Sequence, residues 1–316
     1  MPRDPHEAIA HNARPISRMA NDPQKELALK EKFGRISPTP FITRLVKKAK
    51  FENSGLSLYD KKFTIIVATN SLVSEPFLTC YANLRKYTTA NFQIVGVESH
   101  FKESLYNHAR DMNIALKGAE SDYIILINDD LYVFDGWLKA LVAPALEDPR
   151  IGIVGGLFLY PDLKTIQHAG HFYDPLGYDE GKVYWGHRFQ FENIETTPEA
   201  LIPCPTIGVT GALMLINREC IKNVGVWDDV NFPLGWNDPD FCIRAWQKGW
   251  KTYYNPCCIA IHYEGYSIGK MKYRSLLDES CWIRFQAKWS KEKLLEVSVR
   301  VDDKIVVPWL KKINGR

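Results

Sequence analysis

The alternation of strand and helix patterns in the first half of the chain constrains the fold most strongly. Apolar runs rich in β-branched residues predict buried strands at 63–69, 92–97 and 123–128. Apolar residues that recur at helical spacing predict helices at 75–85, 105–116 and 138–146. Strands and helices that alternate in this way form a mainly parallel sheet with helices on both faces. We therefore expect an α/β domain.

The second half of the chain has a less regular pattern. It predicts a strand with a glycine bend at 151–160, a strand at 211–217, a helix at 238–249 and a strand at 258–263. Positions 161–206 are rich in proline, glycine and aromatic residues and are expected to form loops over the edge of the sheet.

The two ends of the chain are more basic than its body. Residues 1–62 hold 13 Lys and Arg against 7 Asp and Glu, and the rest of the chain holds 27 against 30. From position 286 the balance is again basic, 8 against 4. We expect a basic N-terminal extension (1–62) with short helices at 23–32 and 42–51, a main domain (63–285) and a basic C-terminal tail (286–316). Such an arm either attracts nucleic acid or an anionic membrane surface, or packs on the body or a partner chain.

Several protein classes are excluded by what the sequence lacks. No run approaches 18 consecutive apolar residues, and the first thirty residues show no apolar signal-peptide core. The seven cysteines form no C-x-x-C pair, so neither a disulfide framework nor a zinc ribbon is expected. Neither a Walker A loop nor a G-x-G-x-x-G fingerprint occurs, which argues against P-loop kinases and dinucleotide oxidoreductases. We expect a cytoplasmic protein, with peripheral membrane contact left open.

Polar residues follow the predicted strands at the points where these end. They are Thr69-Asn70, Glu98-Ser99, Asn128-Asp129-Asp130 and His262. In open α/β sheets ligands bind at the carboxyl ends of the strands. Carboxylates and an imidazole that meet there would make a site for a divalent cation and a polar ligand.

Each of these signals also has a purely structural interpretation. Asp129-Asp130 is equally typical of a turn in which Asp side chains bond the backbone. His262 alone is more typical of a hydrogen-bonded structural histidine. Asp238, followed by Pro239, either caps the predicted helix or acts as a general base at the rim of the sheet. The segment His168-Ala-Gly-His171 lacks the H-E-x-x-H pattern, so no zinc site is predicted there.

Taken in order, several segments resemble the family 2 glycosyltransferases of the GT-A fold. The segments that carry the resemblance are FTIIVATN, VGVES, Ala109-Arg110-Asp111, SDYIILINDD with DGWL, LYPD with IQHAG, TGALMLINRECIKNVGVWDD, and WNDPDFCIRAWQKGWKTYYNPCCIAIHYEGYSIG. They run from about Phe63 to Gly269. The segment YIILINDD is similar to the family's Asp-x-Asp metal signature, and WNDPDF to the block that carries its catalytic acid.

The resemblance implies an inverting transfer from a nucleotide-diphosphate sugar to a hydroxyl of a glycan or polysaccharide acceptor. The donor would be UDP-, dTDP- or GDP-linked, and Mn²⁺ or Mg²⁺ would be held by Asp130 and His262. Asp238 would be the base. Donor contacts are implied for Thr69, Asn70, Glu98, Arg110, Asn128 and Asp129, with Arg110 on the diphosphate and with Thr69 and Glu98 on the nucleoside. Acceptor contacts are expected for Trp236, Asn237 and Gly211.

Two departures from the family pattern leave alternatives open. Asn237 stands where the family usually has Glu, and Asn128 replaces the first Asp of the metal signature. The first departure permits a catalytically inactive binding protein. The basic arm permits the same chemistry on nucleic acid, such as a hydroxymethylated base. A nucleotidyltransferase with the same sheet is a further alternative. The segment 159–170 makes a deoxyhexose such as rhamnose conceivable as the sugar.

Overall fold

A computed structural model describes residues 13–15, 38–99, 107–174, 184–263, 274–290 and 293–294. The strands are β1 (Ala13–Pro15), β2 (Lys62–Thr69), β3 (Asn91–Glu98), β4 (Tyr123–Asn128), β5 (Leu131–Val133), β6 (Ile151–Leu159), β7 (Ile166–His168), β8 (His171–Asp174), β9 (Tyr184–His187), β10 (Cys204–Pro205), β11 (Leu213–Asn217) and β12 (Lys251–His262). The helices are α3 (Pro40–Glu52), α4 (Glu75–Tyr87), α5 (His108–Gly118), α6 (Trp137–Glu147), the short 3-10 helix η1 (Pro198–Leu201), α7 (Arg218–Val224), α8 (Asn237–Gln247) and α9 (Arg274–Lys288).

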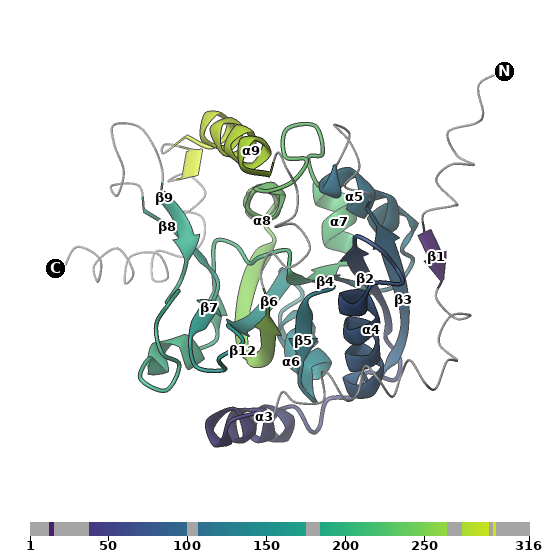
Figure 1. Ribbon diagram of the computed structural model, residues 1–316, viewed down its shortest axis with the longest axis vertical. Helices are drawn as coiled ribbons and strands as arrows, with labels where there is room; N and C mark the ends of the chain where they lie inside the picture. The colour runs from purple at the N-terminus through teal and green to yellow at the C-terminus, as the bar shows by residue number, and fades with distance from the viewer. Residues whose placement is uncertain are drawn as a thin grey trace.

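One large sheet forms the centre of the molecule, with strand order β1-β3-β2-β4-β11-β6-β12-β10 (Figure 1). β2 pairs in parallel with β3 and with β4, and β6 pairs in parallel with β12. β11 lies antiparallel between β4 and β6, so β4 and β6 are parallel to each other. The strands β2, β3, β4, β6 and β12 therefore all point the same way. A small separate sheet consists of β8 and β9. The carboxyl ends of β2, β3, β4 and β12 therefore lie on one edge.

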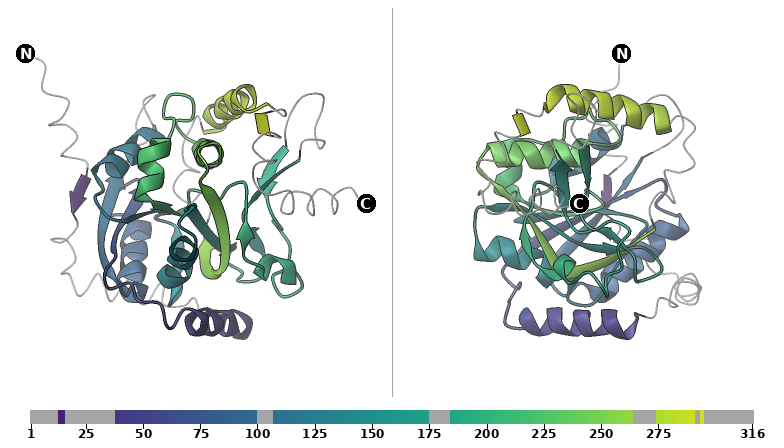
Figure 2. Two further views of the ribbon diagram at one scale, coloured as in Figure 1. Left: turned by 180° about the vertical axis from the view of Figure 1, so that it is seen from behind. Right: turned by 90° about the vertical axis from the view of Figure 1, so that its left-hand side faces the viewer.

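Helices cover both faces of the sheet, and each face has its own apolar core. On one face α4 and α6 supply Phe77, Cys80, Leu84, Trp137 and Leu141. On the other face α5, α7 and α8 supply Ala109, Met112, Cys220, Phe241 and Cys242. The predicted α/β class, with a mainly parallel sheet between two helical layers, is confirmed. Helices α3 and α9 lie at opposite ends of the molecule (Figure 2).

The strand predicted at 151–160 is present as β6, which continues through Gly155 and Gly156. An irregularity lies in the neighbouring strand β12, whose register shifts between Asn255 and Ile259. A Cβ on Gly156 would lie 2.3 Å from the backbone oxygen of Cys258. Gly156 is therefore needed for the close approach of the irregular part of β12.

Other differences concern the second half of the chain. Positions 161–206 contain the short strands β7 to β10 in addition to loops, and β12 begins seven residues earlier than predicted. Helix α9 continues to Lys288, past the position where a tail was expected to begin. The predicted helix at 23–32 lies outside the described residues. All seven cysteines are free, as expected from their spacing.

Candidate active site

The end of β4 and the end of β12 bring together the two predicted metal ligands. His262 Nε2 lies 3.1 Å from Asp130 Oδ1, and both side chains are buried. The amide nitrogen of Asn128 lies 3.5 Å from the same imidazole nitrogen. β5 holds this arrangement in place, because it pairs with β12 and the Tyr263 N–H donates to the Asp130 carbonyl.

Gln167 fixes the tautomer of His262. His262 Nδ1 lies 2.8 Å from Gln167 Oε1, and Gln167 Nε2 donates to the backbone oxygen of His262. Because an amide oxygen only accepts, Nδ1 carries a proton, and Nε2 is the nitrogen that faces Asp130. Sequence reasoning assigned no role to Gln167, since the two residues are far apart in the chain.

The facing atoms fit a divalent cation. Asp130 Oδ1 is buried and has no hydrogen-bond partner within the described part of the chain. It faces His262 Nε2 at 3.1 Å, and a cation bound by the carboxylate oxygen and the imidazole nitrogen would interact favourably with both. A carboxylate with an imidazole suits Mn²⁺, and hard oxygen ligands suit Mg²⁺.

Asp129 and Thr69 bond each other in the wall of the site. The Thr69 hydroxyl donates to Asp129 Oδ2 at 2.6 Å, and the Ser71 N–H donates to that hydroxyl. Both side chains are buried. This bond ties the end of β2 to the turn after β4, so Asp129 supports the turn while Asp130 faces His262. A contact of Thr69 with the nucleoside stays a prediction.

The remaining residues predicted for the donor lie along the same edge. Glu98 pairs with Thr69 in the register of β3 and β2, and both Glu98 and Asn70 are partly exposed. Arg110 lies in the first turn of α5, is exposed, and contacts Asp111 at 3.4 Å. The structure thus leaves Glu98, Asn70 and Arg110 accessible at the rim of the sheet.

Asp238 lies in the first turn of α8, but it does not cap the helix. The N-cap is Trp236, which has a left-handed backbone (φ 67°), and Asn237 is the first helical residue. The predicted Asp238 cap is therefore wrong. The carboxylate instead accepts the Gly211 N–H at 2.8 Å. Burial raises the pKa of Asp238 to about 6, although hydrogen bonds from Gly211 and Thr210 act in the opposite direction.

The residues Gly211 and Ala212 connect Asp238 to the end of β4 through their backbone hydrogen bonds. Gly211 donates to Asp238, and the next carbonyl, that of Ala212, accepts the Asn128 N–H at 3.0 Å. Asp238 and the end of β4 therefore lie on either side of one short backbone segment at the edge of the sheet. A carboxyl with a pKa near neutrality in such a place is suited to take up a proton.

The residues expected to contact the acceptor differ in accessibility. Trp236 is partly exposed, and its ring lies 4.6 Å from that of Trp282 and 4.9 Å from that of Phe285. Asn237 is buried, and its amide donates to the carbonyls of Phe232 and Leu234. Asn237 thus shapes the loop before α8, and its direct contact with an acceptor stays a prediction.

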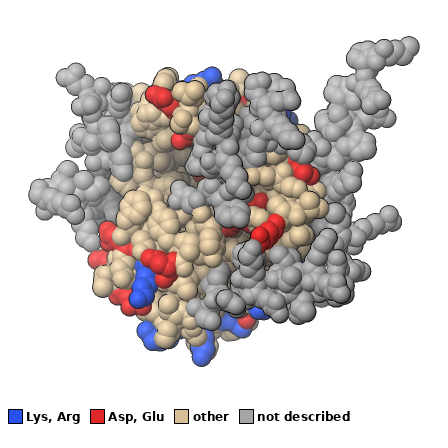
Figure 3. All heavy atoms as spheres, viewed as in Figure 1, with Lys and Arg blue, Asp and Glu red and all other residues tan. Residues whose placement is uncertain are grey.

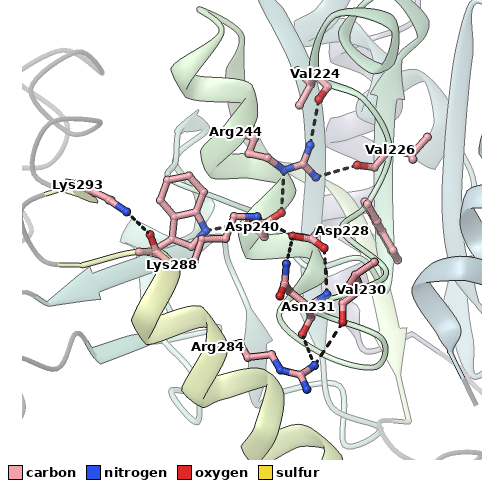
Figure 4. Close-up of polar contacts among 12 residues, drawn as sticks. Val224, Val226, Asp228, Val230, Asn231, Asp240, Arg244, Arg284, Lys288 and Lys293 are labelled. Carbon is pink, nitrogen blue, oxygen red and sulfur yellow. Dashed lines mark hydrogen bonds and ion pairs between the residues drawn. The ribbon is translucent and has the colours of Figure 1, made fainter.

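Helix α9 is fastened to α8 through Asp240 (Figure 4). Asp240 is fully buried and accepts from Arg244 Nε at 2.8 Å, from Lys288 Nζ at 2.7 Å and from Trp289 Nε1 at 2.9 Å. Lys288 also contacts Asp228 at 2.8 Å, which holds the pKa of that carboxyl at about 2 against the effect of burial. These ion pairs fix the N-terminal turn of α8, and they had no signal in the sequence beyond the spacing of Asp240 and Arg244.

Comparisons with known proteins agree with the motifs. Residues 82–225 match the model of the glycosyl transferase family 2. The O-antigen biosynthesis protein RfbC of Myxococcus xanthus is 27% identical over 51% of this chain and 12% of that protein. The N-acetylglucosaminyl-diphospho-decaprenol L-rhamnosyltransferase of Mycobacterium tuberculosis is 25% identical over 54% of this chain and 60% of that protein. A crystal structure of GalNAc-T7 with UDP, GalNAc and Mn²⁺ aligns with a TM-score of 0.47 and 14% identity over 64% of this chain and 43% of that one.

Residues 82–225 match the family 2 glycosyltransferase model, in agreement with the resemblance seen in the motifs of the chain. The chain spans less than two thirds of the length of either curated relative. Among the described residues, no helix is both long and apolar enough to cross a lipid bilayer.

Proposed function

We propose that this protein is a metal-dependent, inverting glycosyltransferase that moves a sugar from a nucleotide-diphosphate donor to a hydroxyl of a glycan acceptor. The observation that carries the proposal is the pairing of two chemically different centres on one edge of the sheet. Asp130 and His262 form a buried pair whose potential metal-ligand atoms face each other, and Asp238 is a carboxyl with a raised pKa beside the same backbone segment.

The first centre would hold the donor diphosphate. A Mn²⁺ or Mg²⁺ ion bound by Asp130 and His262 would neutralise the negative charge that develops on the departing nucleoside diphosphate. Asn128 and Gln167 orient the imidazole, and Asp129 supports the turn through Thr69. Arg110, Glu98 and Asn70 remain accessible for the donor along the edge.

The second centre would activate the acceptor. Asp238 takes the proton of the acceptor hydroxyl while the hydroxyl oxygen bonds to the anomeric carbon and the bond from that carbon to the diphosphate oxygen breaks. Attack from the face opposite the leaving group inverts the configuration. A base of this kind contributes about 10²–10⁴-fold to the rate. The pKa of about 6 leaves most of the carboxyl ionised at pH 7 and close enough to neutrality to accept a proton.

The replacement of the usual Glu by Asn237 is compatible with an active enzyme. The Asn237 amide donates two hydrogen bonds to loop carbonyls, and an ionised Glu has no donor for them. An amide at this position therefore has a structural role, and the proton acceptor at the next position is retained. This argues against the inactive binding protein as an alternative.

A glycan acceptor is favoured by the aromatic pair beside the base. Trp236 and Trp282 offer apolar ring faces of the kind on which sugars stack. On the face shown in Figure 3, most of the described Lys and Arg side chains lie toward the margins of the molecule.

The test is a panel of UDP-, dTDP- and GDP-sugars, including deoxyhexoses because of the name of the mycobacterial relative, with and without Mn²⁺. We expect one donor at 100 times its Kd to stabilise the protein by about 2.7 kcal/mol only when Mn²⁺ is present. The same donor should release nucleoside diphosphate when an acceptor is added. Release of pyrophosphate would instead identify a nucleotidyltransferase, and no response to any donor would contradict the proposal.

A further inference from the structure

Three histidines form a cluster next to the site, and the proposed reaction uses none of them. They are His168 in β7, His171 in β8 and His187 in β9. The ring centroids lie 4.7 to 4.9 Å apart, and one ring nitrogen of each lies within 4.8 Å of the others. Burial lowers the pKa of all three, so the rings are neutral at pH 7.

Hydrogen bonds indicate the tautomers of His168 and His187. His168 Nε2 accepts the Thr210 N–H at 3.3 Å, so the proton of this neutral ring is on Nδ1. His168 Nδ1 lies 2.9 Å from His187 Nδ1 and donates to it. His187 then carries its proton on Nε2, which donates to the backbone carbonyl of Gln167.

Each end of this chain of bonds reaches one of the two proposed centres. At one end, Thr210 bonds Asp238 through its side chain, and Gly211, the next residue, donates to the same carboxylate. At the other end, the side chain of Gln167 accepts from His262 Nδ1 at 2.8 Å. The path Thr210–His168–His187–Gln167 thus joins the segment that holds Asp238 to the residue that orients His262.

We propose that His168 is a positioning residue that fixes the place of the base, Asp238, relative to the proposed metal-binding histidine, His262. The inference rests on the proposed function. Neutral imidazoles suit this task because each ring donates at one nitrogen and accepts at the other, and they add no charge beside the cation site. The bond lengths hold the loop at Thr210 and the strand β7 at a set separation.

In this cluster His168 and His187 form a hydrogen-bonded pair and His171 lies beside them. We do not assign the cluster as a metal-binding site. The tautomers inferred from the hydrogen bonds put a proton between the facing Nδ1 atoms of His168 and His187, where a shared metal would need two lone pairs. His171 stands outside the path. Its Nδ1 lies 3.3 Å from the Gly186 carbonyl, and its Nε2 has no partner among the described residues.

Two substitutions at His168 separate the two halves of the path. The side-chain oxygen of Gln takes the place of Nε2, so His168→Gln keeps the acceptor for Thr210 and loses the bond to His187. The side-chain amide of Asn takes the place of Nδ1, so His168→Asn keeps the donor to His187 and loses the bond to Thr210. His171→Asn is the matched control, because the Asn amide keeps the bond to the Gly186 carbonyl.

The measurements are Mn²⁺ binding and steady-state kinetics on the full chain. Electron paramagnetic resonance of free Mn²⁺, with UDP as the nucleotide probe, gives the Mn²⁺ Kd without any turnover. For His168→Gln we expect the Mn²⁺ Kd to rise about tenfold, as for other partners behind a metal ligand, with the acceptor KM unchanged. For His168→Asn we expect an unchanged Mn²⁺ Kd and a kcat about 10- to 100-fold lower, because Asp238 is misplaced.

The outcomes distinguish the two proposals. If the wild-type protein binds no Mn²⁺ with UDP, dTDP or GDP, the proposed function fails. If it binds Mn²⁺ but both His168 variants match His171→Asn in Kd, kcat and melting temperature, the positioning role is overturned. Equal loss in both variants, in step with melting temperature, also overturns it. One equivalent of zinc in the purified protein that is absent from His171→Asn would show a metal cage and overturn it as well.

Discussion

Replacing Asp238 by Asn should make the protein more stable and nearly inactive. The free energy of unfolding changes because the folded protein raises the pKa of Asp238 from its ordinary value of 3.8 to about 6. The folded state therefore holds the proton more tightly than the unfolded state, and the ionised carboxylate is unfavourable in the fold. An Asn side chain is uncharged and still offers an oxygen to the Gly211 N–H.

The size and pH dependence of the gain follow from linkage. Each pKa unit corresponds to about 1.36 kcal/mol, so the ionised Asp238 costs about 3 kcal/mol above pH 6. Below pH 3.8 the carboxyl is protonated in both states and the cost is absent. We expect Asp238→Asn to be as stable as the wild type near pH 3.8 and up to about 3 kcal/mol more stable at pH 7.

The assay is urea unfolding of both proteins at several pH values, together with sugar transfer at pH 7. Transfer should fall about 10²–10⁴-fold, because the proton acceptor is lost while the fold is kept. A variant that is less stable than the wild type at pH 7, or equally stabilised at pH 4 and 7, would refute the account of burial. Retained transfer would refute the assignment of the base.

Four further predictions follow from the geometry. Asp130→Ala should abolish Mn²⁺-dependent binding of UDP in calorimetry; normal binding would make the turn purely structural. The kcat/KM of transfer should fall as the pH drops through about 6, because Asp238 takes up its proton there. A kcat/KM that stays constant from pH 5 to 8 would argue against this. Asp240→Ala should lower the free energy of unfolding by about 3–5 kcal/mol, because it leaves Arg244 and Lys288 without their buried partner, and a loss under 1 kcal/mol by urea titration would contradict this. Gly156→Ala should destabilise by about 1–3 kcal/mol, since its Cβ would meet a backbone oxygen; a thermal melt at the wild-type temperature would contradict this.

The parallel half of the sheet was predictable because each strand is an uninterrupted apolar run. β2 and β4 are buried along nearly their whole length, and strand ends that share a sheet edge bring their polar residues together by topology alone. The convergence of Asp130 with His262 follows from that rule. Only the second part of β12 was predicted, because its irregularity opposite Gly156 breaks the side-chain alternation from which strands are recognised.

What the sequence did not reveal depends on contacts between distant residues. The start of α8 is set by the left-handed backbone of Trp236, a loop conformation that local preference assigns to Gly or Asn. The partner of Gln167 lies on β12 and that of His168 in the loop before β11, so no spacing rule could identify them. The polar network behind the site is therefore visible only once the sheet is assembled.

The position of a bound cation shows whether Asp130 and His262 hold the metal. Crystals grown with Mn²⁺ and UDP, measured at a wavelength where manganese scatters anomalously, should show one peak bonded to Asp130 and His262 with the diphosphate beside it. Such a peak at the His168, His171 and His187 cluster, with none between Asp130 and His262, would contradict the account.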